Sequence, residues 1–96
     1  MITVKRKPNG IEIDGHALYD EPGKDIVCAA VSALIQTLIA SIEELTQDNL
    51  QYDLMPGLAN LRYKNLSTGA QTLVDSFFVG VRMIADEYPA YVRLIV

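Results

Sequence analysis

Residues 25–46 read DIVCAAVSALIQTLIASIEELT, a segment whose apolar residues recur at helical spacing. Asp25 opens it, and a carboxylate in this position can accept hydrogen bonds from the free amides of a first helical turn. The pattern therefore predicts a helix that runs from Asp25 to about Thr46. Steps of three and four residues put one apolar stripe on the face of this helix that meets the core: Val27, Val31, Leu34, Leu38, Ile42 and Leu45.

The same segment has no charged residue between Ile26 and Ile42, which approaches the length of a membrane span. Polar side chains such as Ser32 and Gln36 interrupt it, and charged residues follow it directly from Glu43. We therefore expect a helix buried in a globular core and no contact with a membrane.

Stretches of alternating polarity lie on both sides of this helix. Each pair surrounds a turn signal, Pro8-Asn9-Gly10 in the first case and Pro56-Gly57 in the second. Alternation with period two across a tight turn is typical of a β-hairpin. We predict two hairpins, one from residues 1–7 and 11–14 and the other from residues 50–54 and 59–64.

A second helix follows, for which Thr68-Gly69-Ala70-Gln71 matches a capping box and Pro89 marks the stop. It should end near Glu87. Its predicted core stripe is Leu73, Phe77, Val81, Ile84 and Tyr88.

The last segment, residues 91–96, is apolar on both faces except for Arg93, so we expect a strand that is either central in the sheet or covered by a second subunit. The element order is then ββαββαβ. Short hairpins and two long helices predict an α+β fold, a two-layer sandwich with two helices packed on one face of a mainly antiparallel five-stranded sheet. The opposite sheet face is a candidate dimer surface, although ordinary solvation explains it as well.

Composition narrows the class of protein. The chain has 96 residues, 8 Lys+Arg and 12 Asp+Glu, for a net charge of −4. This length predicts a single domain over residues 1–96, without a cleft between two lobes. The acidic balance argues against direct nucleic acid binding, which needs a basic face. One cysteine excludes an intramolecular disulfide, and the N-terminus lacks the pattern of a signal peptide, so we expect a cytoplasmic protein.

Cys28, the only cysteine, falls in the first turn of the predicted helix. Unpaired amides and the helix dipole favour negative charge there, which favours a thiolate. The backbone amides of this turn, including that of Cys28, could also hold an oxyanion. The alternative is that Cys28 is a small buried hydrophobe beside Ala29 and Val31.

His16 is the only histidine, and it lies where the first hairpin ends and a loop begins. A thiol protease needs an imidazole that ion-pairs with the thiolate and then protonates the leaving amine. His16 can equally be an ordinary surface residue. Asp25, Cys28 and Ser32 share one helix face, and Ser32 can contact a substrate or bond back to the Cys28 carbonyl.

Residues 15–17 read GHA and residues 23–32 read GKDIVCAAVS. This pair of motifs closely resembles the ribosomal-processing cysteine protease (Prp) family. The resemblance implies that Cys28 is the nucleophile and His16 the general base and acid, with Asp25 and Ser32 in support. It also implies a mobile loop over the substrate groove that includes Ala17, Leu18, Tyr19 and Gly23.

The resemblance further implies a cytoplasmic, homodimeric bacterial endopeptidase. Its partner would be the N-terminal extension of a large-subunit ribosomal protein, which it removes for ribosome assembly after aromatic residues and before a small one. Leu18 departs from the family, whose members commonly have a small residue there. Together with Pro22 it should stiffen the loop.

Three other functions fit parts of the pattern. A non-catalytic dimeric binding module associated with ribosomal proteins would be indifferent to Cys28→Ala. Thiol redox chemistry would lack an internal resolving cysteine. His16 and Cys28 are too few ligands for a usual zinc site, so we expect no metal and no other cofactor.

Overall fold

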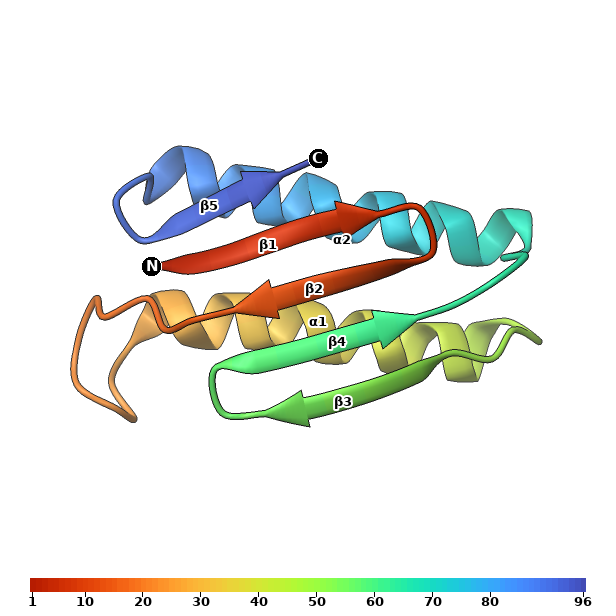
Figure 1. Ribbon diagram of the computed structural model, residues 1–96, viewed down its shortest axis with the longest axis horizontal. Coiled ribbons are helices and arrows are strands. Elements are labelled where there is room, and N and C mark those ends of the chain that lie inside the picture. Colours follow the sequence, from red (N-terminus) through yellow and green to blue (C-terminus); the bar gives the residue numbers. More distant parts are fainter.

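The computed structural model describes residues 1–96 and has the predicted order ββαββαβ (Figure 1). Both hairpins and both helices lie where the periodicity predicts them. Their bounds are β1 (Ile2–Lys7), β2 (Gly10–Asp14), α1 (Ile26–Leu45), β3 (Gln51–Met55), β4 (Leu58–Arg62), α2 (Thr68–Glu87) and β5 (Val92–Ile95).

The five strands form one sheet in the order β3-β4-β2-β1-β5, with both helices in a single layer behind it (Figure 1). The pairs β1–β2, β2–β4 and β3–β4 are antiparallel, and β1–β5 is parallel. The two-layer, mainly antiparallel sandwich is therefore confirmed. β5 is not central, however: it pairs only with β1 and lies at an edge, so its coverage by a second subunit stays a prediction. Its apolar pattern comes from Val92, which is buried under the helices, and from Ile95, which is partly exposed.

The core forms between the sheet and the helices. Alternate strand residues such as Val4, Ile11 and Leu61 are fully buried against the helix layer. The buried residues of α1 are Val27, Val31, Ile35, Leu38, Ile39 and Ile42. By length and composition alone α1 could also cross a membrane, with a mean hydropathy of 1.9, a property that core helices of soluble proteins share.

Two members of the predicted α1 stripe lie elsewhere. Leu34 is only partly buried and Leu45 is 73% exposed, whereas Ile35 and Ile39 take their places in the core. A helix of this length spans about 30 Å, whereas a five-residue strand spans about 17 Å. α1 is therefore longer than the strands, and in its last turn Ile42 is still fully buried while Leu45 lies in solvent.

The start of α2 also differs from the prediction. The N-cap is Ser67, not Thr68: the Ser67 hydroxyl accepts a hydrogen bond from the Ala70 amide at 3.2 Å. Ser67 is held by Asp48, to which its hydroxyl and its amide donate at 2.6 and 2.8 Å. These two bonds lower the pKa of Asp48. Both Ser and Thr are good N-cap residues. The bonds to Asp48, which is distant in sequence, favour Ser67 over Thr68 as the cap.

The apolar stripe of α2 is shifted as well. Phe77 and Val81 are buried as predicted, but Leu73, Ile84 and Tyr88 are only partly buried. The remaining buried residues of the helix are Ala70, Val74 and Phe78.

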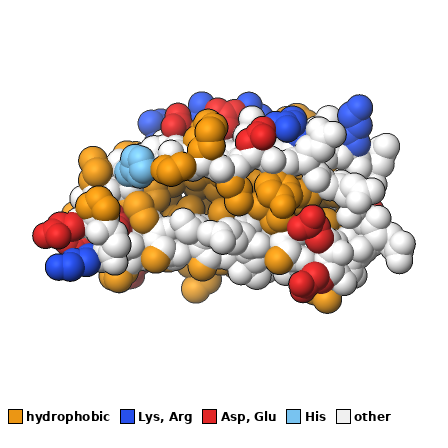
Figure 2. Space-filling view, turned by 90° about the horizontal axis from the view of Figure 1, so that it is seen from below, with side chains coloured by type: hydrophobic (Ala, Val, Ile, Leu, Met, Phe, Trp, Pro, Cys, Tyr) orange, Lys and Arg blue, Asp and Glu red, His pale blue; other side chains and the backbone are white.

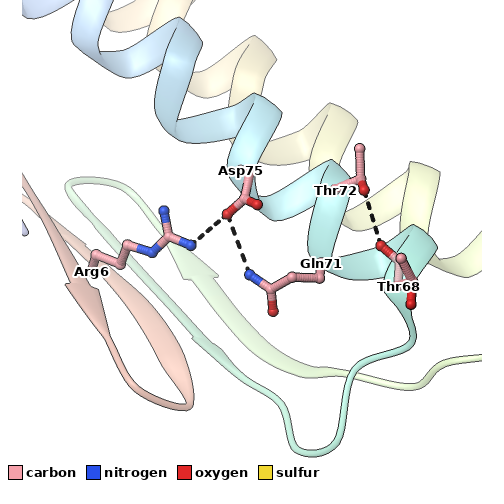
Figure 3. Close-up of polar contacts among 5 residues, drawn as sticks. All are labelled: Arg6, Thr68, Gln71, Thr72 and Asp75. Atoms are coloured by element: carbon pink, nitrogen blue, oxygen red, sulfur yellow. Dashed lines mark hydrogen bonds and ion pairs between the residues drawn. The ribbon is translucent and has the colours of Figure 1, made fainter.

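An ion pair joins the sheet to α2 close to the turn between β1 and β2 (Figure 3). Arg6 of β1 donates to Asp75 of α2 at 2.6 Å, and its guanidinium lies 4.5 Å from the centre of the Phe78 ring. Gln71 also donates to Asp75, and the two partners lower the pKa of that carboxyl. Arg6 therefore points to the helix side, away from Lys5 and Lys7.

The opposite face of the sheet carries charges. Lys7 pairs with Glu12 across the first hairpin, and Arg62 donates to Asp53 at 3.2 Å across the second. Lys5 lies opposite Glu12 in the register, as the polar alternation predicts. Exposed pairs of this kind add little stability, so this face is best described as charged and solvated in the isolated chain.

The last two residues of the predicted α1 stripe provide a matched stability test. Ile42 is fully buried and Leu45 is 73% exposed, three residues apart in one helix. Ile42→Ala should lower the free energy of unfolding by about 2–5 kcal/mol, because it leaves a cavity. Leu45→Ala should change it by only about 0.5 kcal/mol. Urea unfolding measures both, and equal losses would contradict the placement of the last turn.

Candidate active site

Asp25 begins α1, as the sequence predicts. Its Oδ1 atom accepts hydrogen bonds from the amides of Val27 at 3.0 Å and Cys28 at 2.9 Å. Two of the free amides of the first turn are thereby satisfied. Cys28 is fixed in that turn, and its own amide is occupied by Asp25. In this structure the Cys28 amide is therefore not free to hold an oxyanion, and that role stays a prediction.

The other carboxylate oxygen of Asp25 holds the loop of residues 15–25. Oδ2 accepts from the amides of Tyr19 at 2.9 Å and Asp20 at 3.4 Å. Desolvation raises the pKa of Asp25, but the bonds from Cys28, Tyr19 and Asp20 outweigh it, so the net pKa lies below its usual value. One side chain therefore ties the loop to the helix.

Cys28 lies between core and surface. It is partly buried and packs against the hydrophobic core, yet its side chain also lines an open cavity. The Ala17 amide donates to Cys28 Sγ at 3.4 Å. Cys28 therefore contacts the loop as well as the core.

His16 is exposed, and its backbone is tied down on both sides. The Met1 terminal amine donates to the His16 carbonyl at 2.6 Å. The amide of the preceding Gly15 donates to the carbonyl of Gly57 at 2.9 Å. The structure thus brings His16 to the turn between β3 and β4, on the cavity that Cys28 also lines.

That cavity is a groove of about 290 Å³ between α1 and the β3–β4 hairpin. Figure 2 shows it as a hollow with hydrophobic walls, with the histidine at its rim. We call it the apolar groove. Its lining is Ile2, Ile13, Gly15, His16, Cys28, Val31, Ser32, Ile35, Gln36, Leu54, Met55, Pro56, Gly57, Leu58 and Ala59.

A second hollow lies beneath the loop. It measures about 510 Å³ and shares His16, Cys28 and Ser32 with the apolar groove. The remaining lining residues belong to the loop and the start of α1: Leu18, Asp20, Pro22, Gly23, Asp25 and Ala29. Cys28 therefore stands where two hollows meet, which suits a chain that passes over the sulfur.

Ser32 is exposed one turn after Cys28 and lines both hollows. The hydroxyls of Thr46 and Thr72 bond back to the carbonyl four residues earlier. No such bond joins Ser32 to Cys28, so the Ser32 hydroxyl is free to meet another group.

The loop is held at particular residues. Ala17 is buried, and the Tyr19 ring packs edge-on against Tyr88 at 5.5 Å and Tyr91 at 5.1 Å between ring centres. Leu18, which lies between Ala17 and Tyr19 in the sequence, has a φ of 57° and is 78% exposed. The contacts that hold the loop involve Tyr19 and Asp25. The stiffening expected from Leu18 and Pro22 stays a prediction.

Sequence reasoning missed the roles of Gly57, Tyr88 and Tyr91 beside the site. Pro56-Gly57 signals only a turn, and Tyr88 fits the apolar stripe of α2. Nothing local indicates that either segment meets residues 15–19. No group of three or more His, Cys, Asp or Glu side chains in the chain is close enough to hold a metal ion.

The two oxygens of Asp25 allow separate tests of helix and loop. Asp25→Ser keeps an acceptor for the helix amides but removes the acceptor for Tyr19 and Asp20. We expect faster amide exchange at Tyr19 in both Asp25→Ser and Asp25→Ala, and a large drop in Tm only in Asp25→Ala. Unchanged exchange at Tyr19 in Asp25→Ser would contradict the tie between loop and helix.

The same variants have an expected pH dependence. Because folding lowers the pKa of Asp25 from its usual 3.8, its contribution to stability is complete above that pH and is lost as the pH falls through the folded pKa. The difference in Tm between wild type and Asp25→Ala should therefore shrink below about pH 4.

Comparisons with known proteins show the family and the fold that this chain shares. The family model described as "Cysteine protease Prp" matches residues 1–93. The ribosomal processing cysteine protease Prp of Mycoplasma genitalium is 32% identical over 92 residues, which cover 96% of this chain and 92% of that protein. The protein of the same name from Staphylococcus aureus is 32% identical over 103 residues, covering 98% and 97%.

A solved structure has the same fold. It is the crystal structure of an essential ribosomal processing protease Prp from S. aureus in complex with a covalently linked product peptide. It superposes with a TM-score of 0.92 at 29% identity, covering 99% of this chain and 98% of that one. With a family match over nearly its whole length, this chain belongs to the cysteine protease Prp family.

Proposed function

We propose that residues 1–96 form a single cysteine endopeptidase domain that removes the N-terminal extension of a large-subunit ribosomal protein. Cys28 is the nucleophile and His16 the general base and acid. The observation that carries the proposal is that the only cysteine and the only histidine line one groove, in a chain of the cysteine protease Prp family.

Acylation follows from these two side chains. His16 takes the thiol proton of Cys28, and the sulfur attacks the carbonyl carbon of the scissile peptide bond. When the tetrahedral intermediate collapses, the C–N bond breaks, and His16 returns the proton to the leaving amine. The Ala17 amide, 3.4 Å from Sγ, lies where it stabilises the thiolate before the attack.

Deacylation uses the same imidazole. His16 takes a proton from water, whose oxygen attacks the thioester carbon. The C–S bond then breaks, the proton returns to sulfur, and a carboxylic acid leaves. Asp25 supports both steps by holding the first turn and the loop together, and Ser32 presents a free hydroxyl beside the sulfur.

The substrate should cross Cys28 as an extended peptide. The apolar groove suits the aromatic residues that the family resemblance puts before the cut, since burial of apolar surface favours their binding. β3 borders this groove at the sheet edge, and all five of its residues are exposed. A free edge can pair with an added strand.

We further propose that the protein acts in the cytoplasm as a homodimer, without a cofactor, a membrane or direct contact with nucleic acid. The resemblance to the family supports the dimer and the compartment. A net charge of −4 supports the absence of a nucleic acid surface.

The first test is cleavage of the extended ribosomal protein, followed by mass spectrometry. Wild type should release the N-terminal extension, Cys28→Ala should release none, and His16→Ala should be slower by about 10²–10⁴-fold. Circular dichroism must show that both variants are folded. A folded Cys28→Ala protein that still cleaves would exclude Cys28 as nucleophile, and binding without cleavage by any form would favour the binding module.

The second test concerns the apolar groove. Leu54 lines it and is 44% exposed, whereas Met83, 66% exposed, lies on α2 outside it. Leu54→Asp should lower kcat/KM by about 10–100-fold through KM, because a carboxylate would be desolvated by an apolar substrate. Met83→Asp is the matched control and should stay within about twofold. Equal effects of both changes would exclude the groove as the substrate site.

A further inference from the structure

Gly57 lies directly against the imidazole of His16. A Cβ atom built on Gly57 would be 2.6 Å from Nε2, 3.0 Å from Cε1 and 3.3 Å from Cδ2 of that ring. Carbon atoms do not approach other heavy atoms so closely without a shift, since van der Waals contact begins near 3.5 Å. Any side chain at this position must displace either the ring or the turn.

The turn has little freedom to move instead. Gly57 joins β3 to β4, two strands that are paired along their whole length. Its carbonyl accepts the hydrogen bond from the Gly15 amide at 2.9 Å. The same residue therefore holds the backbone next to His16 and leaves room for its ring.

We propose that Gly57 is a positioning residue for His16. By lacking a side chain, it lets the imidazole rest on the β3–β4 turn, and this contact sets the ring at the rim of the apolar groove that Cys28 also lines. The inference rests on the proposed function only in taking His16 as the base. Displacement of a catalytic group by about 1 Å costs on the order of 100-fold in rate.

Glycine could be required here for another reason, its φ of 75°. Alanine is strained at such an angle, whereas asparagine tolerates it better. Both residues carry the Cβ that meets His16. Gly57→Ala and Gly57→Asn therefore separate backbone strain from displacement of the ring.

A remote position supplies the matched control. Asn65 also has a positive φ, 50°, and it lies in the connection between β4 and α2, at the opposite end of β4 from Gly57. Asn65→Ala adds comparable backbone strain without touching the site. It should lower Tm and leave turnover unchanged.

Three readouts test the proposal. Two of them report on a single residue each, because the chain has one histidine and one cysteine. Turnover of the ribosomal protein substrate gives kcat and KM. Alkylation of Cys28 by iodoacetamide, followed against pH, reports how the imidazole acts on the thiol. NMR signals of the His16 ring report its surroundings. Iodoacetamide is much smaller than a peptide. A side chain at position 57 that only obstructed substrate binding would therefore leave the alkylation profile unchanged.

We expect kcat/KM to fall by about 10–100-fold in both Gly57 variants, mainly through kcat. Gly57→Asn should be the more stable of the two and yet no more active. The pH profile of alkylation should shift in both toward that of His16→Ala, and the His16 ring signals should move. Asn65→Ala should match wild type in all three readouts.

Near wild-type turnover in Gly57→Asn, with loss confined to Gly57→Ala, would overturn the proposal in favour of backbone strain. Unmoved ring signals and an unchanged alkylation profile in both variants would also overturn it. Failure of the proposed function is distinguishable: if wild type leaves the ribosomal substrate uncut, alkylation and NMR still decide whether Gly57 positions His16.

Discussion

The Asp25 carboxylate is the contact on which the candidate site depends. One oxygen accepts the amides of Val27 and Cys28, and the other accepts the amides of Tyr19 and Asp20. The helix and the loop that leads from His16 are thereby joined through one side chain, and the bond from the Ala17 amide to Cys28 Sγ adds a second link. Each hydrogen bond to a charged acceptor is stronger than a neutral one, so the ionised carboxylate orders the segment between the two candidate catalytic residues.

The apolar groove exists because the sheet is wider than the helix layer. Neighbouring strands lie about 4.8 Å apart and packed helices about 10 Å apart, so two helices cover about four strands. The strand left over is β3, at the edge, where Tyr52 and Leu54 remain exposed. The uncovered strand and the start of α1 together line the apolar groove to which we assign the substrate.

Local patterns predicted most of the architecture. The two hairpins, the extent of α1 and its cap at Asp25 depend on residues within one turn or one strand, so periodicity and capping chemistry suffice. Predictions failed where a distant segment decides. Asp48 holds Ser67, which caps α2 in place of Thr68, and Leu45 lies in solvent although Ile42 in the same turn is buried. The edge place of β5 excludes only the central one of its two predicted positions.

The same division applies to the site. The motif around His16 and Cys28 can be read in the chain because each residue type carries its own chemistry, and their neighbours in sequence set the helix start. Gly57 and the Tyr88–Tyr91 pair carry no such signal, since a turn glycine and a helix-end tyrosine look the same in any protein. They reach residues 16–19 only when the β3–β4 turn and the end of α2 fold against the loop. Contacts between segments far apart in sequence form only through packing of the whole chain, which local spacing does not encode.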